Sequence, residues 1–150
     1  MNQTELLEKY KAQSDHYFGN ALTSIQAGET EKAGEFLWGS MAQALKAVAA
    51  SEGKGLNTHG EIRKYAMELA KKYNDMSIWD VYGVANSLHG NFYEAGLSLE
   101  EVQTHAERIR TTVLKLFSHI PEEKPEKEES LIPTEPLETM PESWPKNIMI

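Results

Sequence analysis

The sequence predicts an all-α fold, an up-and-down antiparallel bundle of four to five helices followed by an extended C-terminal tail. All six prolines lie in the last thirty of 150 residues, so nothing before Ile120 is barred from a helix by a proline ring or a missing amide. Within residues 1–120, apolar residues return every three or four positions, which is the spacing of one buried helical face. We therefore expect a bundle domain over residues 1–120 and a separate tail over residues 121–150.

The first two helices are expected over residues 3–27 and 30–52. Gly28 ends the first as a left-handed cap, and Gly53 with Gly55 ends the second. The second helix is rich in alanine, glycine and serine, which allow neighbouring backbones to approach closely, so we expect it to be central. The residues expected to face the core are Leu6, Leu7, Tyr10, Tyr17, Ala21, Leu22 and Ile25, then Phe36, Leu37, Met41, Ala44, Leu45 and Val48.

Three further helices are expected over residues 58–74, 77–96 and 98–120. The last carries a regular stripe of apolar residues, and the fourth carries one from Ile78 to Phe92. Short connections between such helices favour antiparallel neighbours. The expected capping boxes are Thr58 with Glu61 and Ser98 with Glu101.

Charge and composition restrict the classes of function. The net charge is −8, divided as −3 on residues 1–120 and −5 on the tail, which argues against nonspecific nucleic-acid binding. A local exception is the third helix with Arg63, Lys64, Lys71 and Lys72, either a solvated face or a phosphate grip. The chain has no cysteine and no apolar run near the ~20 residues that span a bilayer, so we expect a soluble, cytoplasmic protein that does not enter a membrane.

Motifs for metals, nucleotides and nucleophiles are missing. A helical di-iron site needs Glu-x-x-His on two helices, and the chain contains no Glu-x-x-His and no His-x-x-x-His pair. A phosphate-binding loop is absent, and Gly53 and Gly55 belong to a helix end. We therefore expect no metal site and no cofactor.

The fourth helix carries the most suggestive polar residues. Asn86, His89 and Tyr93 are spaced i, i+3 and i+7 on one edge, and Asn91 and Glu94 are close in sequence. A histidine at such an edge could act as an acid or base near neutral pH. The alternative interpretation is a half-buried histidine that hydrogen-bonds to a neighbouring helix.

The fifth helix offers a second polar edge. His105, Arg108, Thr112 and His119 are spaced so that they face broadly one way, either as a solvated flank or as a partner for the His89 edge. If the two edges share a cleft, Arg108 would supply its positive charge.

The tail changes character along its length. A charged stretch is followed by apolar residues among prolines, a pattern typical of an extended segment that lies in a groove, with plain disorder as the alternative. Trp144 would be the anchor because a buried Trp provides roughly 150–250 Å² of contact. The expected docking residues are Leu137, Met140, Trp144 and Ile148, within a partner-binding segment at 131–150.

Three segments together resemble the HEPN superfamily of small archaeal and bacterial helical proteins. They are residues 32–47, the start of the third helix at His59, and the string Leu-His-Gly-Asn-Phe-Tyr-Glu at 88–94, and the resemblance covers roughly residues 5–118. It implies a helical bundle that dimerises, and in many members a metal-independent ribonuclease with Arg, four to six residues, then His. Neither His89 nor His119 has an arginine at that spacing, which implies a divergent or non-catalytic member.

Two functions follow as hypotheses. The leading one is a non-catalytic binding and assembly protein, a homodimer whose tail docks on its mate or on another protein. The alternative is a divergent HEPN-type ribonuclease or nucleotide-binding protein, within a toxin–antitoxin or defence system, which would use His89, Asn91 and Tyr93 with Arg63 or Arg108. The first hypothesis predicts no reaction, and the second predicts cleavage that depends on His89.

Overall fold

The all-α prediction is confirmed. A computed structural model describes residues 2–89 and 96–121, and this part of the chain contains helices and no strand. Its five helices are α1 Gln3–Gln26, α2 Thr30–Ser51, α3 His59–Lys72, α4 Ser77–Ser87 and α6 Leu99–Ser118.

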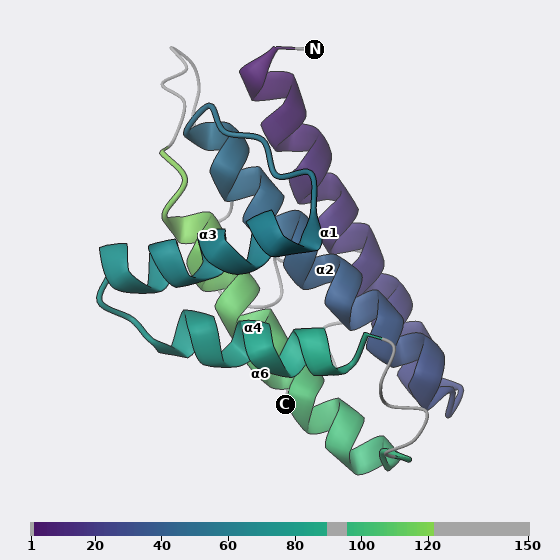
Figure 1. Ribbon diagram of the computed structural model, residues 1–150. Helices are drawn as coiled ribbons and strands as arrows, with labels where there is room; N and C mark the ends of the chain where they lie inside the picture. The colour runs from purple at the N-terminus through teal and green to yellow at the C-terminus, as the bar shows by residue number, and fades with distance from the viewer. Residues whose placement is uncertain (1, 90–95, 122–150) are drawn as a thin grey trace.

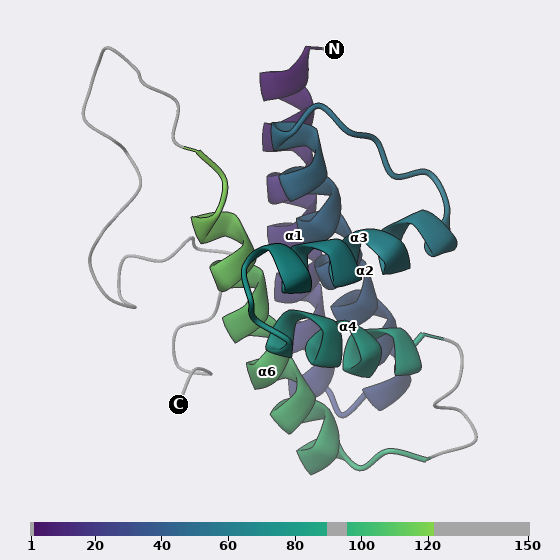
Figure 2. The same cartoon turned by 60° about the vertical axis from the view of Figure 1, so that its left-hand side comes forward.

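The helices form two sets that cross. Helices α1 and α2 are a long antiparallel hairpin, and α3 and α4 lie across it as a shorter antiparallel pair (Figure 1). Helix α6 runs along the side of α2 and also contacts α1 and α4 (Figure 2). Because α2 contacts each of the other four helices, its predicted central position is confirmed.

Small residues bring α1 and α2 close together. The hydroxyl of Ser14 donates to the carbonyl of Ser40 at 2.8 Å, and the hydroxyl of Ser40 donates to the carbonyl of Ser14 at 2.9 Å. Beside this pair, a Cβ on Gly39 would lie 3.0 Å from the Tyr17 ring, so glycine lets that ring rest against α2.

The core follows the expected faces with informative exceptions. Phe18 is 1% exposed although the sequence pattern pointed to its neighbour Tyr17, which is half-buried. Phe36 is also only half-buried, whereas Trp38 is buried. The core residues of α2 include Leu37, Met41, Ala44, Leu45 and Val48, as predicted.

Most helix ends agree with the sequence. Ser98 and Glu101 form a complete capping box. The Thr58 hydroxyl accepts from the amide of Glu61, but the Glu61 carboxylate accepts from the amide of Asn57, so the second expected box is incomplete. Gly28 has φ 76° as a left-handed cap requires.

The expected extent of the fourth helix, to Gly96, is wrong. Helix α4 ends at Ser87, and residues 90–95 lie outside the described residues. In its last turn the Ser87 hydroxyl donates to the carbonyl of Val84 at 2.7 Å, a local side-chain bond that competes with helical hydrogen bonds. His89 therefore follows the end of a helix and does not lie within one.

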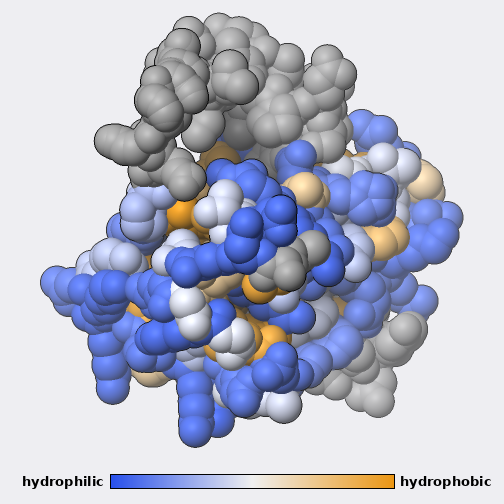
Figure 3. Space-filling model, turned by 90° about the horizontal axis from the view of Figure 1, so that it is seen from above, coloured by the Kyte–Doolittle hydropathy of each residue, from blue (hydrophilic) through white to orange (hydrophobic). Residues whose placement is uncertain are grey.

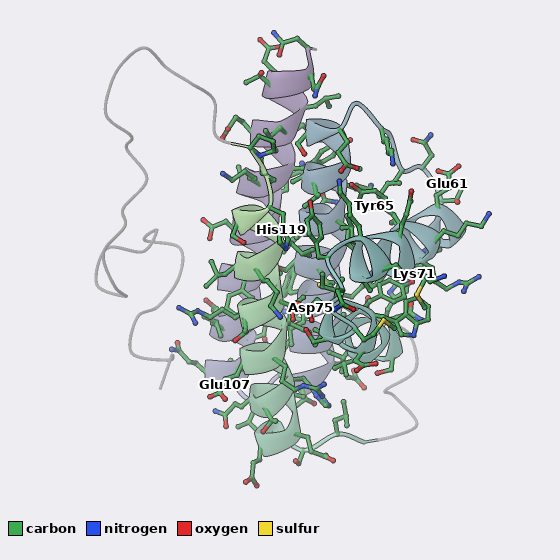
Figure 4. The ribbon with its side chains drawn as sticks, turned by 90° about the vertical axis from the view of Figure 1, so that its left-hand side faces the viewer. Glu61, Tyr65, Lys71, Asp75, Glu107 and His119 are labelled. Atoms are coloured by element: carbon green, nitrogen blue, oxygen red, sulfur yellow. The ribbon has the colours of Figure 1, made fainter. Side chains whose placement is uncertain are left out.

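A polar junction fixes the turn between α3 and α4 to α6. Lys115 of α6 donates to Asp75 at 2.8 Å and to the Ser77 hydroxyl at 2.9 Å, and the Ser77 hydroxyl donates to Asp75 at 2.6 Å. Figure 4 shows Asp75 between α6 and the α3–α4 pair.

The described surface seen from above is mostly hydrophilic, with small apolar areas between the polar side chains (Figure 3). Among the described residues, no helix is long and apolar enough to cross a membrane.

Candidate functional site

Three aromatic rings from separate segments meet in one cluster. Trp38 stacks on His59 with ring centroids 5.0 Å apart and on His89 at 5.3 Å, and the two imidazoles are 5.0 Å apart and nearly parallel. Trp38 is buried while both histidines are exposed. We call Trp38, His59 and His89, with Glu35, the imidazole cluster.

A carboxylate orients one of the two histidines. Glu35 Oε1 lies 2.9 Å from Nδ1 of His89, and both side chains are more than a third exposed. Because a carboxylate only accepts hydrogen bonds, Nδ1 of His89 carries the proton. In the neutral ring, Nε2 is then the nitrogen that can take a proton from a ligand.

Each segment contributes through its local structure. Glu35 and Trp38 are three residues apart on α2 and so lie on one face of that helix. His59 is the first residue of α3, directly after the Thr58 cap, and the amide of His89 donates to the carbonyl of Asn86 as the chain leaves α4. The cluster therefore joins the middle of one helix to the start of a second and the end of a third.

Aromatic residues of α4 support the indole from behind. Tyr82, 3% exposed, meets Trp38 edge-on with centroids 5.9 Å apart, and Trp79 stacks on Tyr82 at 5.7 Å. Burial raises the pKa of Tyr82, and the positive charge of Arg63 partly opposes that shift. Arg63 lies one turn after His59 on α3, so a cation is close to the cluster.

A groove of about 420 Å³ adjoins the cluster and shares Glu35, Trp38 and His59 with it. We call it the α2 groove, because most of its residues follow one face of α2. Its other lining residues are Tyr17, Phe36, Gly39, Ala42, Gln43, Lys46, Asn57, Thr58 and Ile62.

A second cavity, of about 300 Å³, is lined by charged side chains that pair with one another. Tyr65 donates to Glu52 at 2.6 Å, Lys72 donates to the same carboxylate at 2.7 Å, and Lys54 lies between Glu52 and Glu68. Its charges are paired with one another, which favours a role in holding α2 to α3.

The residues expected at the His89 edge have different outcomes. His89 is in the cluster, and Arg63 is near it. Asn86 is exposed on the last turn of α4. Asn91, Tyr93 and Glu94 lie outside the described residues.

The expected edge of α6 does not act as one exposed surface. The side chain of Thr112 is buried, with 2% exposure. The ring of His119 stacks on that of Tyr73, with ring centroids 3.5 Å apart. Arg108 is exposed. The burial of His105, and to a smaller extent the charge of Arg108, lowers the pKa of His105. Among the described residues no interaction joins Arg108 to His89.

The tail residues Leu137, Met140, Trp144 and Ile148 lie outside the described residues, so the structure does not test their docking. In the part of the chain that the structure describes, no three His, Asp or Glu side chains are grouped to hold a metal ion.

Two members of the cluster, Trp38 and Glu35, are not among the site residues that the sequence predicted. Trp38 entered the sequence argument only as part of the segment that carries the HEPN resemblance. Glu35 was not predicted because charged residues on an amphipathic helix usually face solvent. The available signal was their spacing of three residues, which places a carboxylate and an indole on one helical face.

The comparison with protein families supplies a classification. The model of the archaeal PaREP1/PaREP8 family matches residues 9–113, which is more than half of the chain. The chain belongs to this family. The match runs from within α1 to most of α6, so the PaREP1/PaREP8 region includes the imidazole cluster and the α2 groove. In comparisons with curated proteins and with solved structures, no significant match was found.

Proposed function

We propose that this protein binds single-stranded RNA at the imidazole cluster, as a divergent protein of the HEPN type. The observation that carries the proposal is the parallel arrangement of His59 and His89 on Trp38, with Glu35 bonded to His89. Proteins recognise single-stranded RNA by stacking bases on aromatic side chains and by placing donors near phosphates. An exposed pair of imidazoles beside Arg63 offers both kinds of contact.

The HEPN assignment is part of the proposal and rests on which segments meet. The resemblance depends on residues 32–47, His59 and residues 88–94. Glu35 and Trp38 come from the first segment and His89 from the third, so each of the three segments provides a member of the cluster. Segments separated in the sequence that assemble in space support a shared functional role.

Binding is tested with a fluorescently labelled single-stranded RNA and the full-length protein. We expect His59→Ala and His89→Ala each to weaken binding at least about five-fold, the loss of roughly one good contact. His119→Ala is the matched control, because His119 stacks on Tyr73 at the C-terminal end of α3, whereas His59 lies at the start of that helix. If the wild type, both cluster variants and the control bind RNA equally well, with helical content unchanged, the proposal is rejected.

The pairing of Glu35 with His89 raises the question of cleavage. A neutral His89 oriented in this way could take the proton from a ribose 2′-hydroxyl as that oxygen attacks the adjacent phosphorus. The departing 5′-oxygen would take its proton from protonated His59, leaving a cyclic phosphate and a free 5′-hydroxyl. The same RNA, incubated and separated by size, shows whether cleavage occurs, and cleavage that persists in His89→Ala would exclude this assignment.

The tail supports a second proposal, that the protein assembles through it. Apolar residues recur among prolines at 131–150, a pattern that suits docking in a groove of a second copy or of a partner. Light scattering of the full chain and of a truncation after Ile120 tests it. A change in mass or the loss of a partner is expected, and identical mass and partners would refute it.

A further inference from the structure

The outer side of the α3–α4 pair carries apolar side chains that the bundle leaves open. Met76 is 47% exposed, the most exposed large hydrophobic side chain in the described part of the chain, and Trp79, one turn later, is half-buried. Gly83 is exposed one turn further on, where a Cβ would meet no atom within 4 Å. Figure 2 shows no other described helix in front of this pair. We call Met76, Trp79 and Gly83 the α4 strip, because their spacing of i, i+3 and i+7 places them on one side of α4.

Aromatic residues beneath the α4 strip hold Trp79 in place. Its ring stacks on that of Tyr82 with centroids 5.7 Å apart, and Tyr82 meets the buried ring of Trp38 edge-on. The positive charge of Arg63 acts on Tyr82, so this cation of α3 lies close to the strip. An indole that is packed on one side and open on the other is a preformed surface, and a partner binds such a surface with little ordering cost.

The α3 side of the strip carries positive charge. Three cations of α3 have no ion pair among the described residues: Arg63, Lys64 and Lys71. The acids of α3 are engaged elsewhere, because Glu61 accepts from the amide of Asn57 and Glu68 pairs with Lys54. Asp80 is the one acid of α4. The surface therefore combines an open apolar strip with cations that have charge left to neutralise.

The C-terminal segment of the chain has the complementary composition. Residues 131–150 carry three acids, Glu135, Glu138 and Glu142, and one lysine, so their net charge is −2. Trp144 lies among the aliphatic residues of this segment, and a buried Trp provides roughly 150–250 Å² of contact. Its apolar side chains suit the α4 strip, and its acids suit the unpaired cations of α3.

The connection to this segment favours a second copy of the chain as the receiver. The ring of His119 stacks on that of Tyr73, three residues before Met76, so the tail begins beside the strip of its own chain. Residues 122–130 carry five acids and two lysines, and a segment of such net charge favours an extended chain, up to about 30 Å long. The strip itself covers only about 10 Å of helix axis. A connection of that length carries the segment past its own strip and toward a neighbouring molecule.

We propose that residues 131–150 of each copy dock on the α4 strip of a second copy, with Trp144 against Trp79 and the acids beside the cations of α3. This inference rests on the proposed assembly through the tail and names the surface that receives it. Because every copy has both the segment and the strip, two copies exchange their tails about a two-fold axis. The second contact then forms within the complex and strengthens the first.

A mixture of two forms of the full-length protein detects this contact. The chain has no cysteine, so Asn147→Cys takes a single nitroxide label, which broadens the NMR signals of nuclei close to it. The nitroxide protein is mixed with isotope-labelled wild type, and only the wild-type amides are observed, so broadening reports contact between copies. We expect the amide signals of Met76, Trp79 and Gly83 to lose intensity, while that of Ala12, which is exposed on α1, keeps it.

Gly83 provides a matched pair of variants. Gly83→Glu places a long acidic side chain on the strip and Gly83→Ala adds only a methyl group, and both fit because a Cβ there meets open space. In the isotope-labelled protein, Gly83→Glu should abolish the broadening at Met76 and Trp79, and Gly83→Ala should retain it. In the nitroxide protein, Trp144→Ala should abolish the broadening, and Thr134→Ala should retain it.

Three results would overturn the proposal. One is broadening that is absent at Met76 and Trp79 or that is spread evenly over the described helices. Another is broadening that Gly83→Glu leaves unchanged. The third is broadening of the strip that appears only when one chain carries both labels, which would place the segment on its own bundle.

This inference and the assembly proposal fail in distinguishable ways. A mass that changes on truncation after Ile120, without broadening at the α4 strip, would refute the strip and leave assembly through the tail standing. A mass that is identical with and without the tail would refute both.

Discussion

The junction of Asp75, Ser77 and Lys115 is expected to stabilise the fold in a pH-dependent way. Hydrogen bonds from Lys115 and then from Ser77 lower the pKa of Asp75 from 3.8 to about 2. The pKa is lower in the folded state, so this stabilisation is fully present above about pH 4 and is lost as the pH falls through about 2. Lys115→Met removes the larger contribution and keeps most of the aliphatic side chain.

The magnitude follows from the size of the shift. One pKa unit corresponds to about 1.4 kcal/mol, so the whole shift sets a ceiling of roughly 2.5 kcal/mol. The side chains of Asp75 and Lys115 are 27% and 35% exposed, so solvent screens their attraction, and Ser77 contributes part of the shift. We expect Lys115→Met to lose about 1 kcal/mol of unfolding free energy at neutral pH.

Urea unfolding followed by circular dichroism measures this loss at about pH 7 and again near pH 2.5. Lys64→Met is the control, because Lys64 is an exposed lysine of α3. We expect the difference between wild type and Lys115→Met to shrink at the lower pH. The reasoning is refuted if Lys115→Met costs nothing at neutral pH, or if its cost is the same at both pH values.

Three further predictions concern packing. Leu45→Ala, at a fully buried position of the central helix, should cost about 2–5 kcal/mol in urea unfolding, and a loss below that range would mean that the core collapses around the cavity. Burial and the hydrogen bond to Glu52 raise the pKa of the Tyr65 hydroxyl, and burial raises that of Tyr82, so an ultraviolet titration to about pH 11.5 should show fewer ionising tyrosines in wild type than the six in the chain. Tyr65→Phe should leave the titrating number unchanged, and a number that falls by one in this variant would contradict the assignment. Ser14→Ala and Ser40→Ala should each cost about 1 kcal/mol, and a double mutant that costs less than their sum would report the contact between the two hydroxyls, while strict additivity would argue against it.

The helices could be predicted because their signals are local. Apolar spacing located all five described helices, and Ser98 with Glu101 marked the start of α6. The end of α4 was missed because the apolar pattern continues beyond Ser87, while side chains such as Ser87 turn to their own backbone. Local pattern does not decide which hydrogen bonds the chain makes at a helix end.

The candidate site was predictable only in part. His89 stood out as a polar residue beside an apolar stripe, but its partner Glu35 is 54 residues away in the sequence. The expected partner edge on α6 carried Arg108, whereas the observed neighbours come from α2 and α3. Such pairing depends on how helices cross, and residue spacing within one helix does not contain that information.

The central claim is that His59 and His89 together form an RNA-binding surface. The most direct measurement is an NMR titration of the full-length protein with single-stranded RNA, following the imidazole signals of its five histidines. We expect the signals of His59 and His89 to shift together and saturate, while the signal of His119, which stacks on Tyr73 at the other end of α3, stays in place. Shifts confined to other histidines, or no shift at any RNA concentration, would contradict it.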